Sequence, residues 1–124
     1  MNANRIMEEI NDVAKKGMKV RELPIAAGLV MDDKLVITSY TKEISMKGRL
    51  THAELLVLLE ADKLSFTNQK KLESTLFTNL EPCMLCLGAA ITFGVGRIVY
   101  SLESPYDGGT KLLDIFLIIR RVIK

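Results

Sequence analysis

The chain has 124 residues, of which 48% are hydrophobic, and this length fits one domain whose core needs no disulfide bonds. Its 17 basic and 15 acidic residues leave a net charge of only +2. That balance lacks the basic excess of a dedicated nucleic-acid binder, but it neither requires nor excludes a polyanionic partner.

The N-terminal 21 residues carry charges throughout and contain no apolar segment of the kind found in signal peptides. Residues 112–119 are apolar, but the stretch is too short to span a bilayer and Asp114 interrupts it. We therefore expect a cytoplasmic protein with no membrane association. Cys83 and Cys86, the two cysteines, form no secreted disulfide framework and indicate metal or redox chemistry.

The first half of the chain predicts a helix, a β-hairpin and a loop. In order, these are a helix (5–18), a strand (24–31), a second strand (34–40) and a loop (41–51). Gly17 is the predicted stop of the helix, because glycine commonly ends helices. Asp32-Asp33 is the predicted tight turn between the two strands.

The second half alternates helices with strands. In order, the predictions are a helix (52–64), a strand (74–80), a helix (82–93), a strand (97–101) and a turn (104–109). The first of these helices is apolar almost all round, which predicts that it is buried on most sides. Pro82 suits the first position of the second helix, and Gly94 suits its end. This alternation predicts a three-layer α/β/α sandwich.

The two cysteines and the single histidine can form a metal site. Cys83 and Cys86 lie three positions apart at a predicted helix start, so both sulfurs can reach one point. A helix N-terminus favours thiolate, which is the form that binds zinc. A structural zinc site normally closes with four Cys or His ligands, but this chain offers at most three, including His52. The fourth position must be a carboxylate or a water, and an open position filled by water is typical of catalytic zinc.

Glu54 follows His52 by two positions. In mid-helix the two side chains would point about 200° apart, since a helix has 3.6 residues per turn. They can share a site only at the irregular first turn of the helix, and the expected change from loop to helix near Thr51 fits this requirement. Glu54 can then take a proton from water and return it to a leaving amine.

Each motif alone has a plainer explanation. A lone His-x-Glu is almost always incidental, and a lone C-x-x-C in a cytosolic protein can be a redox pair. The bulky Met84 and Leu85 between the cysteines disfavour the redox pair, which also leaves His52 and Glu54 unexplained. Together the motifs match the H-x-E…P-C-x-x-C signature of zinc deaminases.

On these residues the chain resembles the cytidine and deoxycytidylate deaminase superfamily, and within it the branch of tRNA adenosine deaminases and guanine or cytosine deaminases. The resemblance covers roughly residues 5–110 and is strongest at Thr51-His52-Ala53-Glu54, at residues 80–89 and at residues 96–100. It implies a cytidine deaminase-like fold, with a mixed central sheet and helices on both faces. We expect a single deaminase domain over residues 1–124.

The resemblance also implies an activity, which is hydrolytic deamination of a nucleobase or nucleoside of the amino-purine or cytosine type, with release of ammonia. Zn²⁺ would be bound by His52, Cys83 and Cys86. Glu54 would be the catalytic proton shuttle.

The resemblance further implies how the base edge is held, namely by the backbone of Ala53 and by carbonyl groups near Glu81 and Pro82. Relatives often carry a substrate-contacting asparagine in the preceding loop, and Thr41 occupies that place here. The end of the chain, residues 110–124, departs from the pattern as an atypical or shortened segment. Its apolar surface must be buried in the core or against a second subunit, and relatives usually dimerise through this side, so we predict a homodimer.

Three functions follow from these observations. The main prediction is an enzyme acting on a free base or nucleoside. The alternative is a tRNA-specific adenosine deaminase acting on the wobble adenosine, with tRNA as its partner; the scattered basic residues, the absence of Trp, the missing asparagine and the short tail disfavour it. The remoter alternative is a non-enzymatic zinc or redox module.

Overall fold

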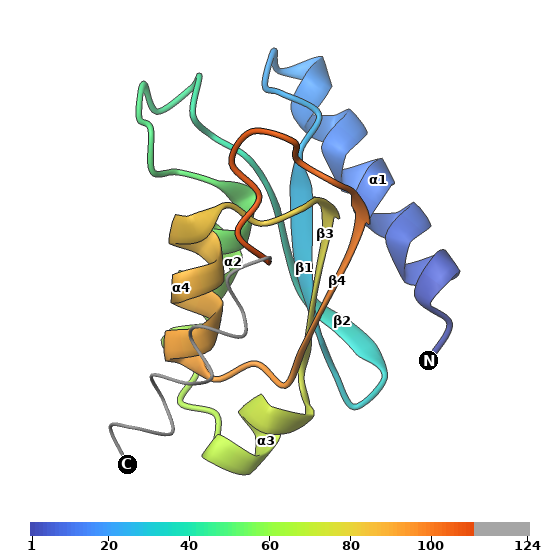
Figure 1. Cartoon of the computed structure of the whole chain (residues 1–124). Helices are drawn as coiled ribbons and strands as arrows, with labels where there is room; N and C mark the ends of the chain where they lie inside the picture. The colour runs from blue at the N-terminus through green and yellow to red at the C-terminus, as the bar shows by residue number, and fades with distance from the viewer. Residues whose placement is uncertain (111–124) are drawn as a thin grey trace.

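The computed structural model describes residues 1–110, which form a four-stranded sheet with helices on both faces (Figure 1). In chain order the elements are α1 (Ala3–Lys19), β1 (Ala26–Met31), β2 (Lys34–Tyr40), α2 (Ala53–Asp62), α3 (Asn68–Glu73), β3 (Thr75–Leu80), α4 (Met84–Phe93) and β4 (Arg97–Leu102). The expectations for the apolar tail concern residues 111–124, which lie outside the described residues. None of the described helices is both long and apolar enough to cross a membrane.

The sheet has the strand order β2-β1-β3-β4 and is mixed. Strand β1 runs antiparallel to β2 and β3, whereas β3 and β4 are parallel. Every residue of β1 is buried, because α1 covers one face of the sheet while α2 and α4 cover the other (Figure 1). Ala27 and Leu29 belong to the core under α2 and α4, and Ala26 and Val30 to the core under α1. The predicted three-layer sandwich with a mixed sheet is confirmed.

Helix α1 does not stop at Gly17, so that prediction was wrong. The helix begins after Asn2, whose side chain accepts the Arg5 N–H at 3.1 Å, and it continues to Lys19. A Cβ atom at Gly17 would lie 2.8 Å from Cγ of Tyr40. The glycine therefore lets the helix approach the Tyr40 ring of β2, and its role is packing rather than termination.

The predicted hairpin turn is confirmed. Asp32 and Asp33 both have positive φ angles, 50° and 61°, between the paired residues Met31 and Lys34. Two consecutive residues in the left-handed region match the twist of the flanking strands.

Two further helix predictions need correction. Helix α3 was not predicted, because none of its residues is buried and it therefore has no apolar periodicity. Helix α4 does not begin at Pro82 but at Met84, with Cys83 as its N-cap. Its end at Gly94 agrees with the prediction, since this glycine has a φ of 104° and forms the C-cap.

Candidate active site

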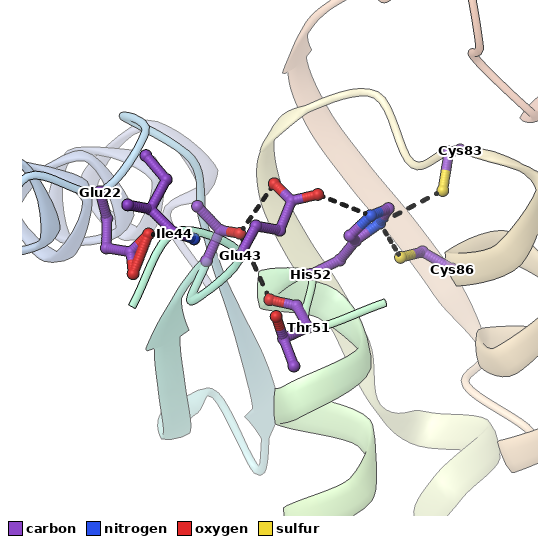
Figure 2. A network of polar contacts seen from close by, with 8 residues as sticks. Glu22, Glu43, Ile44, Thr51, His52, Cys83 and Cys86 are labelled. Atoms are coloured by element: carbon purple, nitrogen blue, oxygen red, sulfur yellow. Dashed lines mark hydrogen bonds and ion pairs between the residues drawn. The ribbon is translucent and has the colours of Figure 1, made fainter. Parts of the chain in front are cut away.

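The three predicted metal ligands come together at the first residues of two helices. His52 is the N-cap of α2 and Cys83 the N-cap of α4, and Cys86 lies in the first turn of α4. Nδ1 of His52 lies 3.5 Å from Sγ of Cys83 and 3.4 Å from Sγ of Cys86 (Figure 2). All three ligand atoms lie within 4.8 Å of one another.

This donor set fits zinc. A tetrahedral Zn²⁺ with Zn–S of about 2.3 Å and Zn–N of about 2.0 Å holds a nitrogen and a sulfur ligand about 3.5 Å apart. The two N–S distances of 3.5 and 3.4 Å match this separation. One imidazole and two sulfurs are also ligands that zinc prefers. The predicted cofactor is therefore supported by the geometry of the described residues.

Burial raises the pKa of the Cys86 thiol, and the nearby Glu54 carboxylate and Cys83 thiol raise it further. Desolvation disfavours the charged thiolate, so burial opposes the expected effect of the helix N-terminus at Cys86. A cation held by His52, Cys83 and Cys86 would favour the thiolate, and its binding would be accompanied by loss of the thiol proton.

Glu54 lies beside the ligand group in a buried position, with only 4% of its surface exposed. Helix α2 begins at Ala53 and His52 has an extended backbone, which confirms that His52 and Glu54 sit at the irregular start of the helix. The Thr78 hydroxyl of β3 lies 2.8 Å from Oε1 of Glu54 and 2.9 Å from the Leu80 carbonyl, and its single hydrogen is shared between these two acceptors. Thr78 is fully buried in β3, so its hydroxyl restrains the Glu54 carboxylate from the side of the sheet.

A cavity of about 140 Å³ opens at this carboxylate. Drug-sized ligands occupy pockets of about 300–1,000 Å³, so this cavity has the scale of one ring system. His52, Glu54 and Cys83 line it, as do Thr41 and Ala53 of the predicted substrate contacts.

Near the predicted carbonyl contacts, Glu81 and Pro82 also bind the segment that follows β4. The Glu81 carboxylate lines the cavity but accepts the backbone N–H groups of Ser104 (3.1 Å) and Thr110 (3.2 Å). Pro82 is fully buried, and its carbonyl accepts the Gly109 N–H at 2.8 Å. Glu81 and Pro82 thus fasten the segment after β4 against the start of α4.

Four cavity residues were not predicted from the sequence, and one of them is Ile25, which lies just before β1. Asp107 lies in the stretch expected only to be a turn, Glu43 in the stretch expected only to be a loop, and Leu80 at the end of β3. Glu43 and Asp107 reach the site through loops, and neither belongs to a local motif. The one usable signal was their carboxylate chemistry, which is common on solvated surfaces.

Comparisons with known proteins agree with this geometry. The model of the cytidine and deoxycytidylate deaminase zinc-binding region matches residues 1–102. A tRNA-specific adenosine deaminase of Bacillus subtilis (strain 168) is 34% identical over 103 residues, which cover 82% of this chain and 63% of the relative. The chain spans about half to two thirds of the length of the curated relatives it matches.

Two solved structures share the fold. One comes from biochemical and structural studies of A-to-I editing by tRNA:A34 deaminases at the wobble position of transfer RNA. It has a TM-score of 0.73 and 26% identity, and the match covers 85% of this chain and 80% of that one. The second, a guanine deaminase from Bacillus subtilis, has a TM-score of 0.74 over 98% of this chain and 95% of its own, with 20% identity, and shows likeness of fold alone.

The match to the family model spans most of the described residues and includes His52, Cys83 and Cys86. The chain therefore belongs to the cytidine and deoxycytidylate deaminase family.

Proposed function

We propose that this chain catalyses hydrolytic deamination of a nucleobase or nucleoside that carries an exocyclic amine on a purine or pyrimidine ring. One observation carries the proposal: the buried Glu54 carboxylate and the His52, Cys83 and Cys86 ligand group lie together at a cavity of base size. The reaction consumes one water, forms a ring carbonyl and releases ammonia.

In this proposal His52, Cys83 and Cys86 hold Zn²⁺, which lowers the pKa of a water molecule toward neutrality when it is bound. Glu54 accepts a proton from the attacking water and delivers a proton to the leaving amine. The hydrogen bond from Thr78 occupies Oε1 of Glu54 and restrains the carboxylate during both transfers.

The base would be oriented by backbone and hydroxyl groups at the cavity wall. The Ala53 N–H belongs to the first residue of α2, and the first N–H groups of a helix have no partner within the helix. Thr41 lines the same cavity, and the residue as a whole is 1% exposed. Pro82 would contribute through its carbonyl, which retains a second lone pair beyond its bond from Gly109.

Deamination of the wobble adenosine in tRNA is the second candidate. Its support is the similarity to the tRNA-specific adenosine deaminase of Bacillus subtilis. The loop that carries Thr41 and Glu43 into the cavity also carries the basic residues Lys42, Lys47 and Arg49. Basic side chains beside a base pocket can contact the phosphates of an RNA loop whose base is turned outward.

Ammonia release separates these candidates. The zinc-loaded chain is incubated with guanine, cytosine, adenine, their nucleosides and a tRNA anticodon stem-loop. Release from a free base or nucleoside supports the main proposal, whereas release from the stem-loop alone establishes the second candidate. A zinc-loaded chain that deaminates none of them would contradict both and favour a non-enzymatic zinc module.

We also propose that the chain forms a single deaminase domain and acts in the cytoplasm. We further propose that two copies form a homodimer through α2 and α4. Leu59, Met84 and Leu85 are 53%, 60% and 40% exposed and border an apolar groove of about 610 Å³ between these helices. Exposed apolar patches of this kind commonly mark protein interfaces. Sedimentation should give twice the chain mass of 13.8 kDa, and Leu59→Lys should shift it toward the monomer. A monomeric unmodified chain would contradict the dimer.

A further inference from the structure

The side of the His52 ring that faces away from the sulfurs contacts a carboxylate. Oε1 of Glu43 lies 3.0 Å from Nε2 of His52, whereas Nδ1 faces Cys83 and Cys86 (Figure 2). We propose that Glu43 is a positioning residue of the metal centre, which orients the His52 ring and keeps its proton on Nε2. This inference rests on the proposed function in that the ion held by the site is zinc.

The chemistry of imidazole explains why such a partner matters. A neutral imidazole has one N–H donor and one nitrogen lone pair, and only the lone pair can bind a metal. A carboxylate at Nε2 accepts the N–H and thereby leaves the Nδ1 lone pair directed at the sulfurs. Histidines that ligate metals commonly donate their second nitrogen in this way, which fixes the tautomer and the ring orientation and raises ligand basicity.

The pair is also shielded from solvent. The His52 and Glu43 side chains are 24% and 26% exposed, so water competes with this contact less than it does at an open surface. A fully exposed ion pair contributes little to stability, because water and salt compete with it.

Glu43 is itself held in place through its second oxygen. The Thr41 hydroxyl donates to Oε2 of Glu43 at 3.2 Å and lies 3.3 Å from the Thr51 carbonyl. Thr41 is fixed in turn by its backbone N–H, which donates to the Ile25 carbonyl at 2.9 Å. Both oxygens of Glu43 are therefore used, one toward the metal ligand and one toward the cavity wall.

A second anchor fixes the backbone just beyond Glu43. The Glu22 carboxylate, which is only 5% exposed, accepts the backbone N–H groups of Ile44 at 2.9 Å and Ser45 at 3.0 Å. Glu22 follows the end of α1 and lies beside Ile44, so it ties the loop to the connection between α1 and β1 (Figure 2). With anchors at Thr41 and at Ile44, Glu43 is held by contacts within the protein itself, as preorganised sites require.

This arrangement has a consequence for substrate contact at Thr41. A threonine hydroxyl carries a single hydrogen, and here that hydrogen is directed at Glu43 and Thr51. Toward the cavity Thr41 can therefore offer only an oxygen lone pair, which accepts from an N–H or O–H group of a substrate.

Zinc affinity and histidine NMR test the proposal on the full chain. We compare Glu43→Ala and Glu43→Gln with the unmodified protein and with Glu8→Ala, which removes an exposed carboxylate from α1. Zinc affinity is measured by competition with a chromophoric chelator, and Glu43→Ala should lower it about 10- to 100-fold. Glu43→Gln keeps an acceptor oxygen and should lose less, and Glu8→Ala should lose nothing.

The ¹⁵N chemical shifts of the imidazole in the zinc-free protein give a readout that a purely structural role would not change. The chain has one histidine, so the signals need no further assignment. We expect the Nε2–H tautomer in the unmodified protein and a mixture of tautomers in Glu43→Ala. Unchanged affinity and tautomer in Glu43→Ala would overturn the inference, and deamination by the same preparation would leave the proposed function standing. An unmodified chain that binds no zinc would overturn both.

Discussion

Glu54→Gln should remove most of the deaminase activity while zinc stays bound. Glutamine keeps the size of the side chain and an oxygen that can accept the Thr78 hydrogen bond, but it cannot carry a proton between water and amine. Acid–base catalysis by a positioned side chain contributes about 10²- to 10⁴-fold, so we expect kcat to fall by that factor. The measurement is ammonia release, with metal content determined by mass spectrometry on the same sample.

Zinc retention is expected because Glu54 is one of the groups that raise the pKa of the Cys86 thiol. Removing its charge makes the thiolate easier to form, and thiolate is the ligand. Glu60→Gln is the matched control, since Glu60 is an exposed residue of the same helix. It should retain full activity. A Glu54→Gln protein that holds zinc and deaminates at the normal rate would mean that another group moves the proton.

Gly96→Ala should destabilise the protein strongly. A Cβ atom at this position would lie 1.7 Å from the backbone oxygen of Leu72, and the Gly96 N–H donates to the Ser74 carbonyl at 3.1 Å. Backbone cannot move aside as a flexible side chain can, so the segment from α3 to β3 must separate from the start of β4. Overpacking that forces backbone to shift costs about 1–3 kcal/mol, and occasionally more. Urea unfolding with an unchanged m-value measures the loss.

Gly88→Ala is the matched control for that experiment. It makes the same chemical change in α4, where a Cβ atom meets none of the described residues within 4 Å. Because Gly88 borders the groove of the proposed dimer, both glycine variants are compared in the Leu59→Lys background. Alanine is favoured over glycine in a helix by about 1 kcal/mol, so this variant should be at least as stable as the unmodified protein. Equal stability of the Gly96 and Gly88 variants would show that the close approach at Leu72 is absent in solution.

The layers of the fold could be predicted because they depend on periodicity that is visible in short segments. Strand β1 is a continuous apolar run and is buried on both faces, and the Asp32-Asp33 turn fixes its hairpin. Helix α3 could not be predicted, since it buries none of its residues. The role of Gly17 was also hidden, because it depends on Tyr40, a residue brought close only by folding.

The candidate site also has one part that could be predicted from the sequence and one part that could not. His52, Glu54, Cys83 and Cys86 lie in two short motifs whose spacing follows helix geometry, so their convergence could be argued from sequence. The contact between Glu43 and His52 depends on the path of the loop between β2 and α2, which no local pattern specifies. Loops position their side chains through long-range hydrogen bonds, and the Glu22 anchor is one of these.

The proposed zinc ligands lie at the starts of two separate helices. Binding of the ion would therefore stabilise the folded protein. His52 and Cys83 lie 31 positions apart, so an unfolded chain rarely presents both to one ion. A ligand that binds only the native state adds about 2.7 kcal/mol to its stability at a hundred times its dissociation constant. Scarcity of zinc would therefore lower the amount of this protein in a cell as well as the proposed activity, because proteases remove chains that open more often.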